Sequence, residues 1–251
     1  MVQLSFSALA NIAGVLVHTA LAAPSDKRAA SCSFPNPSSS TDVTFDAART
    51  VTASDPFDGE RKKQLYIRPP FLLTHSPNLI IRQESALQPW GQVRRNVVIG
   101  ANQNEGIHCQ GPCTIRNVWF EDVCEDAITI RQSSGTSTIT GGGAKSAADK
   151  VVQHNGGGLV KIDSYCVQDF GKLYRSCGNC GTQVKREVQI SNVIARNGKL
   201  LARVNSNYGD VARIDTKSNS YTSLTSVCDT FEGNNKGDEP STLTKNESNG
   251  K

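Results

Sequence analysis

The 251-residue chain has few aromatic side chains (6%), a single methionine and little net charge, +4 from 27 basic and 23 acidic residues. Helix-forming residues are scarce while Gly, Asn, Ser, Thr and Val are frequent, which argues against a coiled coil and favours strands joined by many turns. Few aromatics and a near-neutral charge also argue against nucleic acid as a partner, because that binding depends on base stacking and many phosphate contacts. The composition excludes collagen and bulk disorder.

One long apolar run is present, Leu4 to Leu21, and small residues at Ala20, Ala22 and Ala23 close it. Because the run is short and interrupted by polar residues, it predicts a signal peptide over 1–22 rather than a membrane anchor. A dibasic pair, Lys27-Arg28, predicts the end of a short pro-segment over 23–28, whose removal takes two cations and one anion and leaves a charge of +3. We therefore expect a secreted, extracellular protein with no membrane partner, whose eight cysteines form disulfides.

The rest of the chain divides by composition. Residues 29–42 are a Pro/Ser-rich leader, residues 43–233 are expected to form one domain, and residues 234–251 are a polar tail. Asn246 in the tail begins an Asn-Glu-Ser sequon and is a candidate glycosylation site.

Short β-rich segments repeat along the domain, each with a small polar residue between apolar stretches. These turn residues are Asn96, Asn117, Ser164 and Asn192, at intervals of 21, 47 and 28. The middle interval fits two repeats of about 23 residues, with the missing copy near residues 138–141. A period in the low twenties predicts a parallel β-solenoid, in which each coil buries its side chains against its neighbours; a β-sandwich with regularly spaced turns is the alternative.

Acidic side chains recur at the same period. Glu105 lies 20 residues before Glu125-Asp126, so these acids would stack on successive coils. Stacked carboxylates repel unless a cation lies between them, and calcium, which prefers oxygen ligands, is the natural candidate. Solvated surface acids are the alternative.

Basic side chains follow the acids. Lys150 and Lys172 are 22 residues apart, and Arg175 follows closely, so they would form a column beside the acidic one. Adjacent acidic and basic columns predict a groove for a chain-like anion, bound partly through metal and partly through Lys and Arg.

Long blocks of the sequence resemble the secreted fungal pectate lyases of polysaccharide lyase family 3. The resemblance rests on residues 96–103, 105–109, 141–144 and 149–156, on Asn117-Val118-Trp119-Phe120-Glu121-Asp122-Val123-Cys124-Glu125-Asp126-Ala127, and on Asp169-Phe170-Gly171-Lys172-Leu173-Tyr174-Arg175-Ser176-Cys177-Gly178-Asn179-Cys180. It implies a right-handed parallel β-helix, monomeric, that cleaves polygalacturonate (pectin) by β-elimination with Ca²⁺. By position, Glu105, Glu125 and Asp126 match the family's calcium acids, Lys150 its proposed base, and Lys172 and Arg175 its other catalytic and substrate-binding cations.

Other interpretations of these residues stay open. Lys150 could form a surface ion pair with Asp149, and as a base it would need a lowered pKa, which neighbouring cations and calcium would supply. A catalytically impaired, pectate-binding homologue is the main alternative function. A hydrolytic polygalacturonase would need paired aspartates, which the Lys/Arg column argues against. His108 is expected to pack internally, and neither His108 nor His154 is counted among the catalytic residues.

Residues 58–93 depart from the resemblance. They contain several prolines and an Arg-Lys-Lys run but no cysteine, so we expect that they can scarcely form two regular coils. Our hypothesis is that this segment is translated out of frame or mis-spliced. Ala202 and Arg203 also stand where the family usually has small residues or Cys. We expect Cys177 and Cys180 to form a tight disulfide, and Cys228 or Cys32 to be left unpaired.

Overall fold

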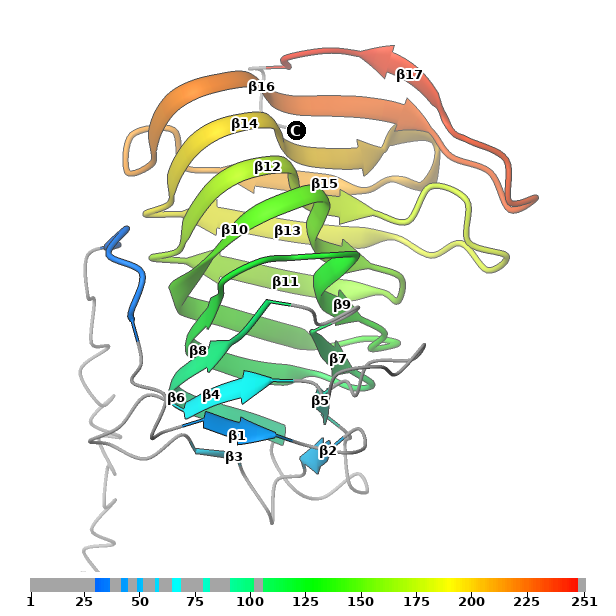
Figure 1. Cartoon of the computed structure of the whole chain (residues 1–251). Coiled ribbons are helices and arrows are strands. Elements are labelled where there is room, and N and C mark those ends of the chain that lie inside the picture. Colours follow the sequence, from blue (N-terminus) through cyan, green and yellow to red (C-terminus); the bar gives the residue numbers. More distant parts are fainter. Residues whose placement is uncertain are drawn as a thin grey trace, which may run out of the picture.

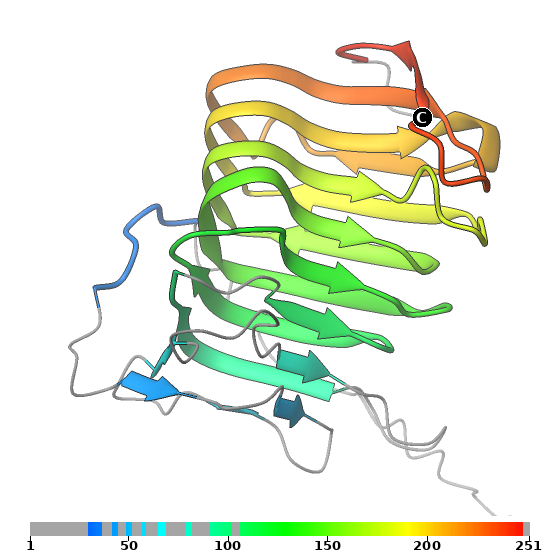
Figure 2. The same cartoon turned by 45° about the vertical axis from the view of Figure 1, so that its right-hand side comes forward.

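The computed structural model describes residues 30–36, 42–44, 49–51, 57–58, 65–68, 79–81, 91–101 and 106–247. Strands in these residues stack coil upon coil from β1 to β16 (Figures 1 and 2). Neighbouring strands are parallel up to β16, and the last pairing, β16 with β17, is antiparallel. The expected parallel β-helix is confirmed and the sandwich alternative is wrong. None of the described helical segments is long and apolar enough to span a membrane.

The strand bounds are as follows. They are β1 Asp42–Thr44, β2 Arg49–Val51, β3 Phe57–Asp58, β4 Leu65–Arg68, β5 Leu79–Ile81, β6 Gly91–Ile99, β7 Ile107–Cys109, β8 Cys113–Phe120, β9 Asp126–Ile130, β10 Thr136–His154, β11 Gly158–Asp163, β12 Cys166–Ser176, β13 Arg186–Ser191, β14 Ile194–Asn205, β15 Val211–Ile214, β16 Ser220–Glu232 and β17 Ser241–Thr244. A short 3₁₀ turn, η2, covers Ser206–Tyr208.

An isoleucine ladder runs through the core on one face of the coils. In-register pairing places Ile115, Ile139, Ile162, Ile190 and Ile214 above one another. The first four of these side chains are buried. Each fully buried isoleucine contributes about 2 kcal/mol of hydrophobic stabilisation, and its branched Cβ suits an extended backbone.

Two corners of the coil are built from residues with positive φ. The first contains Asn117, Gly141, Ser164 and Asn192. The predicted repeat is therefore confirmed at Asn117, Ser164 and Asn192, and Gly141 is the copy expected near 138–141. Asn and Gly suit this corner because they tolerate this backbone region best. The second corner contains Ser146, Asp169, Asn197 and Ser223.

Three disulfides link the described cysteines. Cys177 pairs with Cys180, as expected, and Cys109 pairs with Cys113. Cys32 pairs with Cys166 and Cys228 is free and buried, so the expectation that one of these two would be left unpaired is confirmed for Cys228. Cys124 is also free and exposed.

Parts of the atypical segment 58–93 do form strands. β4 pairs in parallel with β1 and β6, and β5 pairs in parallel with β2 and β7. Leu65-Tyr66-Ile67 and Leu79-Ile80-Ile81 have the β-branched and aromatic residues that strands favour, which explains this difference from the expectation. The prolines between these strands lie outside the described residues.

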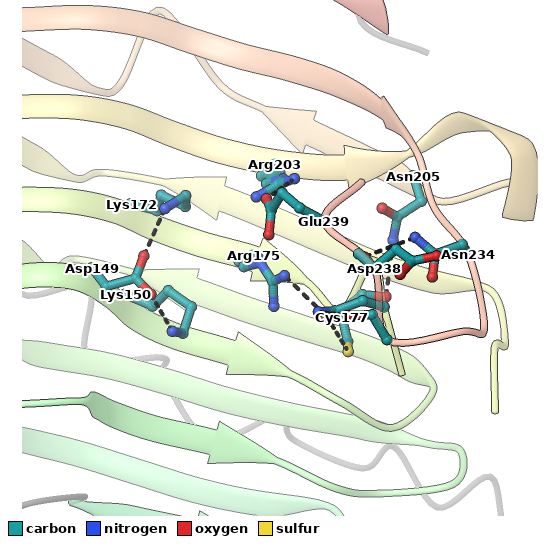
Figure 3. A network of polar contacts seen from close by, with 12 residues as sticks. Asp149, Lys150, Lys172, Arg175, Cys177, Arg203, Asn205, Asn234, Asp238 and Glu239 are labelled. Atoms are coloured by element: carbon teal, nitrogen blue, oxygen red, sulfur yellow. Dashed lines mark hydrogen bonds and ion pairs between the residues drawn. The ribbon is translucent and has the colours of Figure 1, made fainter. Parts of the chain in front are cut away.

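The chain after Asn234, expected to be a polar tail, returns to the last coil. β17 pairs with the end of β16, and the Glu247 backbone N–H donates to the Cys228 carbonyl at 2.8 Å. This return brings the 233–240 loop to the face of the coils that carries the basic residues (Figure 3).

Candidate active site

One column of charged side chains crosses three coils. In-register pairing places Asp126 of β9 beside Lys150 of β10, and Lys150 beside Lys172 of β12. The 22-residue spacing therefore does correspond to one coil. The expectation of separate acidic and basic columns is wrong for these residues, because the acid and the two lysines share one register position. We call Asp126, Lys150 and Lys172 the mixed column.

A β-bulge inserts a second carboxylate into this column. The pairing of β10 with β12 shifts register between Ala147 and Lys150, so β10 has an extra residue there. The Asp149 carboxylate accepts hydrogen bonds from both lysines, at 2.6 Å from Lys172 Nζ (Figure 3). Lys150 Nζ also lies 3.3 Å from Asp126 Oδ1. Lys150 thus contacts two carboxylates while its side chain is only 13% exposed.

These contacts set the charge state of the column. Partial burial would raise the pKa of Asp149, but hydrogen bonds and attraction from Lys150 and Lys172 outweigh it and lower the pKa to about 2. Burial would lower the pKa of Lys150, but Asp149 and Asp126 outweigh it and raise that pKa. The expected lowered pKa of Lys150 is therefore wrong for the free protein, because two carboxylates hold its ammonium form.

Arg175 lies in a second column beside the first. Its register partners are Gln153 on the preceding coil and Arg203 on the following one. The guanidinium donates to Gln153 Oε1 and to Asn179 Oδ1, both at 3.2 Å. Burial, with repulsion from Arg203, lowers the pKa of Arg175. The two amide oxygens hold the planar group in a fixed orientation without neutralising its charge.

The candidate calcium acids are placed in part. Asp126 is buried at 8% exposure, and Glu125 next to it is exposed. Glu105 lies outside the described residues; Gly106, which follows it, donates its backbone N–H to the Asp126 carbonyl at 3.0 Å. Across the described part of the chain no group of three or more His, Cys, Asp or Glu side chains forms a metal cluster. The carboxylate oxygens that are present fit the hard oxygen ligands that calcium prefers.

Several residues of this face were not identified from the sequence as parts of a site. The sequence indicates Asp149 only as a surface partner of Lys150, and no pattern in it indicates Gln153 or Asn179. A repeat period does not reveal a bulge. The position of Asp149 next to Lys150, which lies one coil before Lys172, is the only sequence feature that points to Asp149.

The two histidines in the described part of the chain, His108 and His154, lie in the core, as expected for His108. His154 is buried, with Nδ1 2.8 Å from the Tyr174 hydroxyl and Nε2 3.1 Å from the Gly157 carbonyl oxygen. Burial lowers its pKa to about 4, so it is neutral at ordinary pH. His108 in β7 is also buried, at 6% exposure.

Comparison with known proteins identifies the family of this chain. Residues 32–238 match the family model described as pectate lyase. Pectate lyase E of Emericella nidulans is 46% identical over 236 residues, which cover 93% of this chain and 87% of that protein. A probable pectate lyase D of Neosartorya fischeri is 48% identical over 209 residues, covering 82% and 84% of the two chains.

Solved structures match the fold as well. The catalytic domain of pectate lyase PelI from Erwinia chrysanthemi aligns with a TM-score of 0.65 and 28% identity, over 82% of this chain and 93% of that one. The same enzyme in complex with tetragalacturonic acid aligns with a TM-score of 0.58 and 31% identity, over 83% of this chain and 65% of that one. The chain therefore belongs to the pectate lyase family of polysaccharide lyases.

Proposed function

We propose that this chain is a secreted, calcium-dependent pectate lyase that cleaves polygalacturonate by β-elimination and releases 4,5-unsaturated oligogalacturonides. The observation that carries the proposal is the mixed column of Asp126, Lys150 and Lys172 beside Arg175. Relatives named as pectate lyases, which match over most of the chain, and a solved relative that binds tetragalacturonic acid support this assignment.

The charge pattern suits a polyuronate. Polygalacturonate carries a carboxylate on every sugar, and cations on successive coils recur about every 4.8 Å, the spacing of paired strands. Lys172 and Arg175 offer an ammonium and a planar fork to these carboxylates, and a fork can hold a carboxylate through two hydrogen bonds. We assign both residues to substrate binding at the reacting sugars.

Elimination requires removal of the C5 proton. The base takes the C5 proton, the C5–H electron pair becomes the C4–C5 double bond, and the C4–O bond breaks with its pair on the leaving oxygen, which takes up a proton from water. The C5 proton is hardly acidic until the charge that develops on the adjacent carboxylate is neutralised. Arg175 is held in place by Gln153 and Asn179, so it can stabilise that charge without reorganising first.

We assign proton abstraction to Lys150. Its side chain is less exposed than that of Lys172, 13% against 25%, and it lies next to Asp126. Lys150 acts as a base only after its contacts with Asp126 and Asp149 loosen, because these carboxylates stabilise the ammonium form.

Asp126 and Glu125, with Glu105 as the third acid implied by the family resemblance, are the residues that would hold calcium. When bound there, the ion would neutralise the uronate carboxylate next to the reacting carbon. The protein's own contribution is to present oxygen ligands at one end of the mixed column, with the lysines at the other.

The proposal is tested with polygalacturonate as substrate. The ultraviolet absorbance of the unsaturated product should rise with calcium and stop when a chelator is added. Lys150→Ala should lower kcat by about 10² or more, the usual contribution of a positioned general base. Lys185→Ala is the matched control, because Lys185 pairs with Glu187 outside both columns and should leave the rate unchanged.

The product distinguishes the candidate functions. Reducing ends without absorbance would indicate a hydrolase, and binding without either product would indicate the impaired homologue. Full activity of Lys150→Ala would overturn the assignment of the base while leaving the lyase assignment intact.

A further inference from the structure

Arg203 adds a second guanidinium to the column that contains Arg175. It lies on β14, in register with Arg175 on the coil before it. The two arginines are thus about 4.8 Å apart along the solenoid at the backbone, the distance between paired strands. Their outward side chains lie on one face, next to the mixed column (Figure 3).

The Arg203 guanidinium is almost fully buried, at 5% side-chain exposure. Its Nη2 lies 3.1 Å from Glu239 Oε1, and its central carbon lies 3.6 Å from the centre of the Phe231 ring. The buried Nε has no hydrogen-bond acceptor among the described residues. The Arg203 Nε–H is therefore a donor that is not used within the described part of the chain. A carboxylate that approached Nε and Nη2 together would make the two-bond contact that arginine favours.

Glu239 is the exposed partner of this pair. Its side chain is 75% exposed, and it belongs to the 233–240 loop. The backbone of the loop is attached independently, because the Asn234 N–H donates to the Gly178 carbonyl at 2.7 Å and Asn179 Nδ2 donates to the Gly237 carbonyl at 3.4 Å. The Glu239 side chain can therefore turn into solvent while the backbone of the loop stays attached.

Exchange of one carboxylate for another has a small energetic cost. A buried guanidinium needs an anionic partner, since removal of that partner leaves an uncompensated charge. A uronate carboxylate supplies the same chemical group as Glu239, so the cation is never left unpaired in the final state.

We propose that Arg203 binds a uronate carboxylate of the substrate one coil beyond Arg175, and that Glu239 occupies this position in the free protein. The inference rests on the proposed function and deepens it. Glu239 acts as an internal competitor, and Arg203 extends the row of cations that selects de-esterified sugars. The rival explanation is that the pair only attaches the 233–240 loop to the coils.

The test compares the affinities of variants for trigalacturonate, measured by calorimetry with a chelator present so that no elimination occurs. Glu239→Gln keeps the shape of the side chain and removes the competing charge. It should tighten binding by about two- to fivefold, because the Glu239 carboxylate is largely exposed and the charge it contributes is screened as in a surface ion pair. Asp238→Asn removes the same charge one residue earlier and should leave the affinity unchanged. The fully methyl-esterified trisaccharide should bind Glu239→Gln and the natural protein equally.

Variants of Arg203 complete a double-mutant cycle. Arg203→Lys keeps a cation and loses the fork, so it should weaken trigalacturonate binding, and in this background Glu239→Gln should no longer tighten it. If Arg203→Lys is poorly folded, Glu239→Gln and Asp238→Asn alone still decide the question.

The outcomes separate the two proposals. The inference is overturned if Glu239→Gln binds trigalacturonate no better than Asp238→Asn, which is the result expected of a pair that only attaches the loop. A natural protein that binds trigalacturonate but never gives the unsaturated product overturns the proposed function and leaves this inference standing. A natural protein that does not bind trigalacturonate overturns the inference.

Discussion

Replacement of Asp149 by Asn tests the charge balance of the mixed column. The carboxylate lies between Lys150 and Lys172 and accepts hydrogen bonds from both. Asn has the same shape but no charge, so the change removes the ion pairs without creating a cavity. We expect Asp149→Asn to destabilise the protein at pH 7.

The pKa of Asp149 sets the expected loss of unfolding free energy in Asp149→Asn. Its fall from 3.8 to about 2 corresponds to at most about 2 kcal/mol of stabilisation. The Asp149 side chain is 51% exposed, so solvent screens the attraction, and about 1 kcal/mol is the reasonable expectation. Because the folded pKa is depressed, this stability is present above about pH 4 and is lost as the pH falls through about 2.

Urea unfolding measures both effects. The natural protein, Asp149→Asn and the control Asp122→Asn, which changes an exposed acid, are compared at pH 7 and at pH 2. The free-energy difference between the natural protein and Asp149→Asn should be about 1 kcal/mol at pH 7 and should fall to a small fraction of that at pH 2. A difference that is the same at both pH values would refute the electrostatic explanation, since it would have to come from packing.

Three further predictions follow from packing, cross-linking and metal binding. Gly198→Ala should cost about 2 kcal/mol, because a Cβ there would lie 2.1 Å from the Phe170 ring; Phe170→Leu in the same chain should restore part of the loss in thermal unfolding, and no rescue would contradict the clash. Cys32→Ser opens a cross-link between residues 134 apart in sequence and should lower the unfolding free energy by about 4 kcal/mol; an unchanged melting temperature would contradict this. Asp126→Asn should weaken calcium binding at least tenfold in a calorimetric titration, whereas Asp122→Asn should not, and equal affinities would remove Asp126 from the ligand set.

The sequence predicts the fold well because the fold is periodic. The repeat of Asn117, Ser164 and Asn192 follows from the need for positive φ at one particular corner of each coil, and the structure places all three at that corner. The 22-residue separation of Lys150 and Lys172 likewise becomes a direct register pair. The turn residues and the spacing are sufficient to predict the fold where every coil repeats them.

The sequence fails where the period is broken. The bulge that inserts Asp149 between two lysines adds one residue to one strand, and no composition pattern indicates it. The raised pKa of Lys150 depends on that bulge and could not be anticipated from the cations around it. The contact between Arg203 and Glu239 spans 36 residues and depends on the return of the chain after β16, which the polar composition of that segment does not reveal.

The return of the chain over the last coil protects the solenoid from growth. A stack of parallel strands ends in a row of backbone N–H and C=O groups that another chain could extend. Here β17 pairs with Thr230–Glu232 of β16, and Asn246 accepts a hydrogen bond from the Val227 N–H at 3.1 Å, so the segment occupies much of that row. The same segment thus covers the exposed edge of the last coil and places Glu239 beside Arg203. A chain cut short before Ser241 would expose a strand edge that could pair end to end with another molecule.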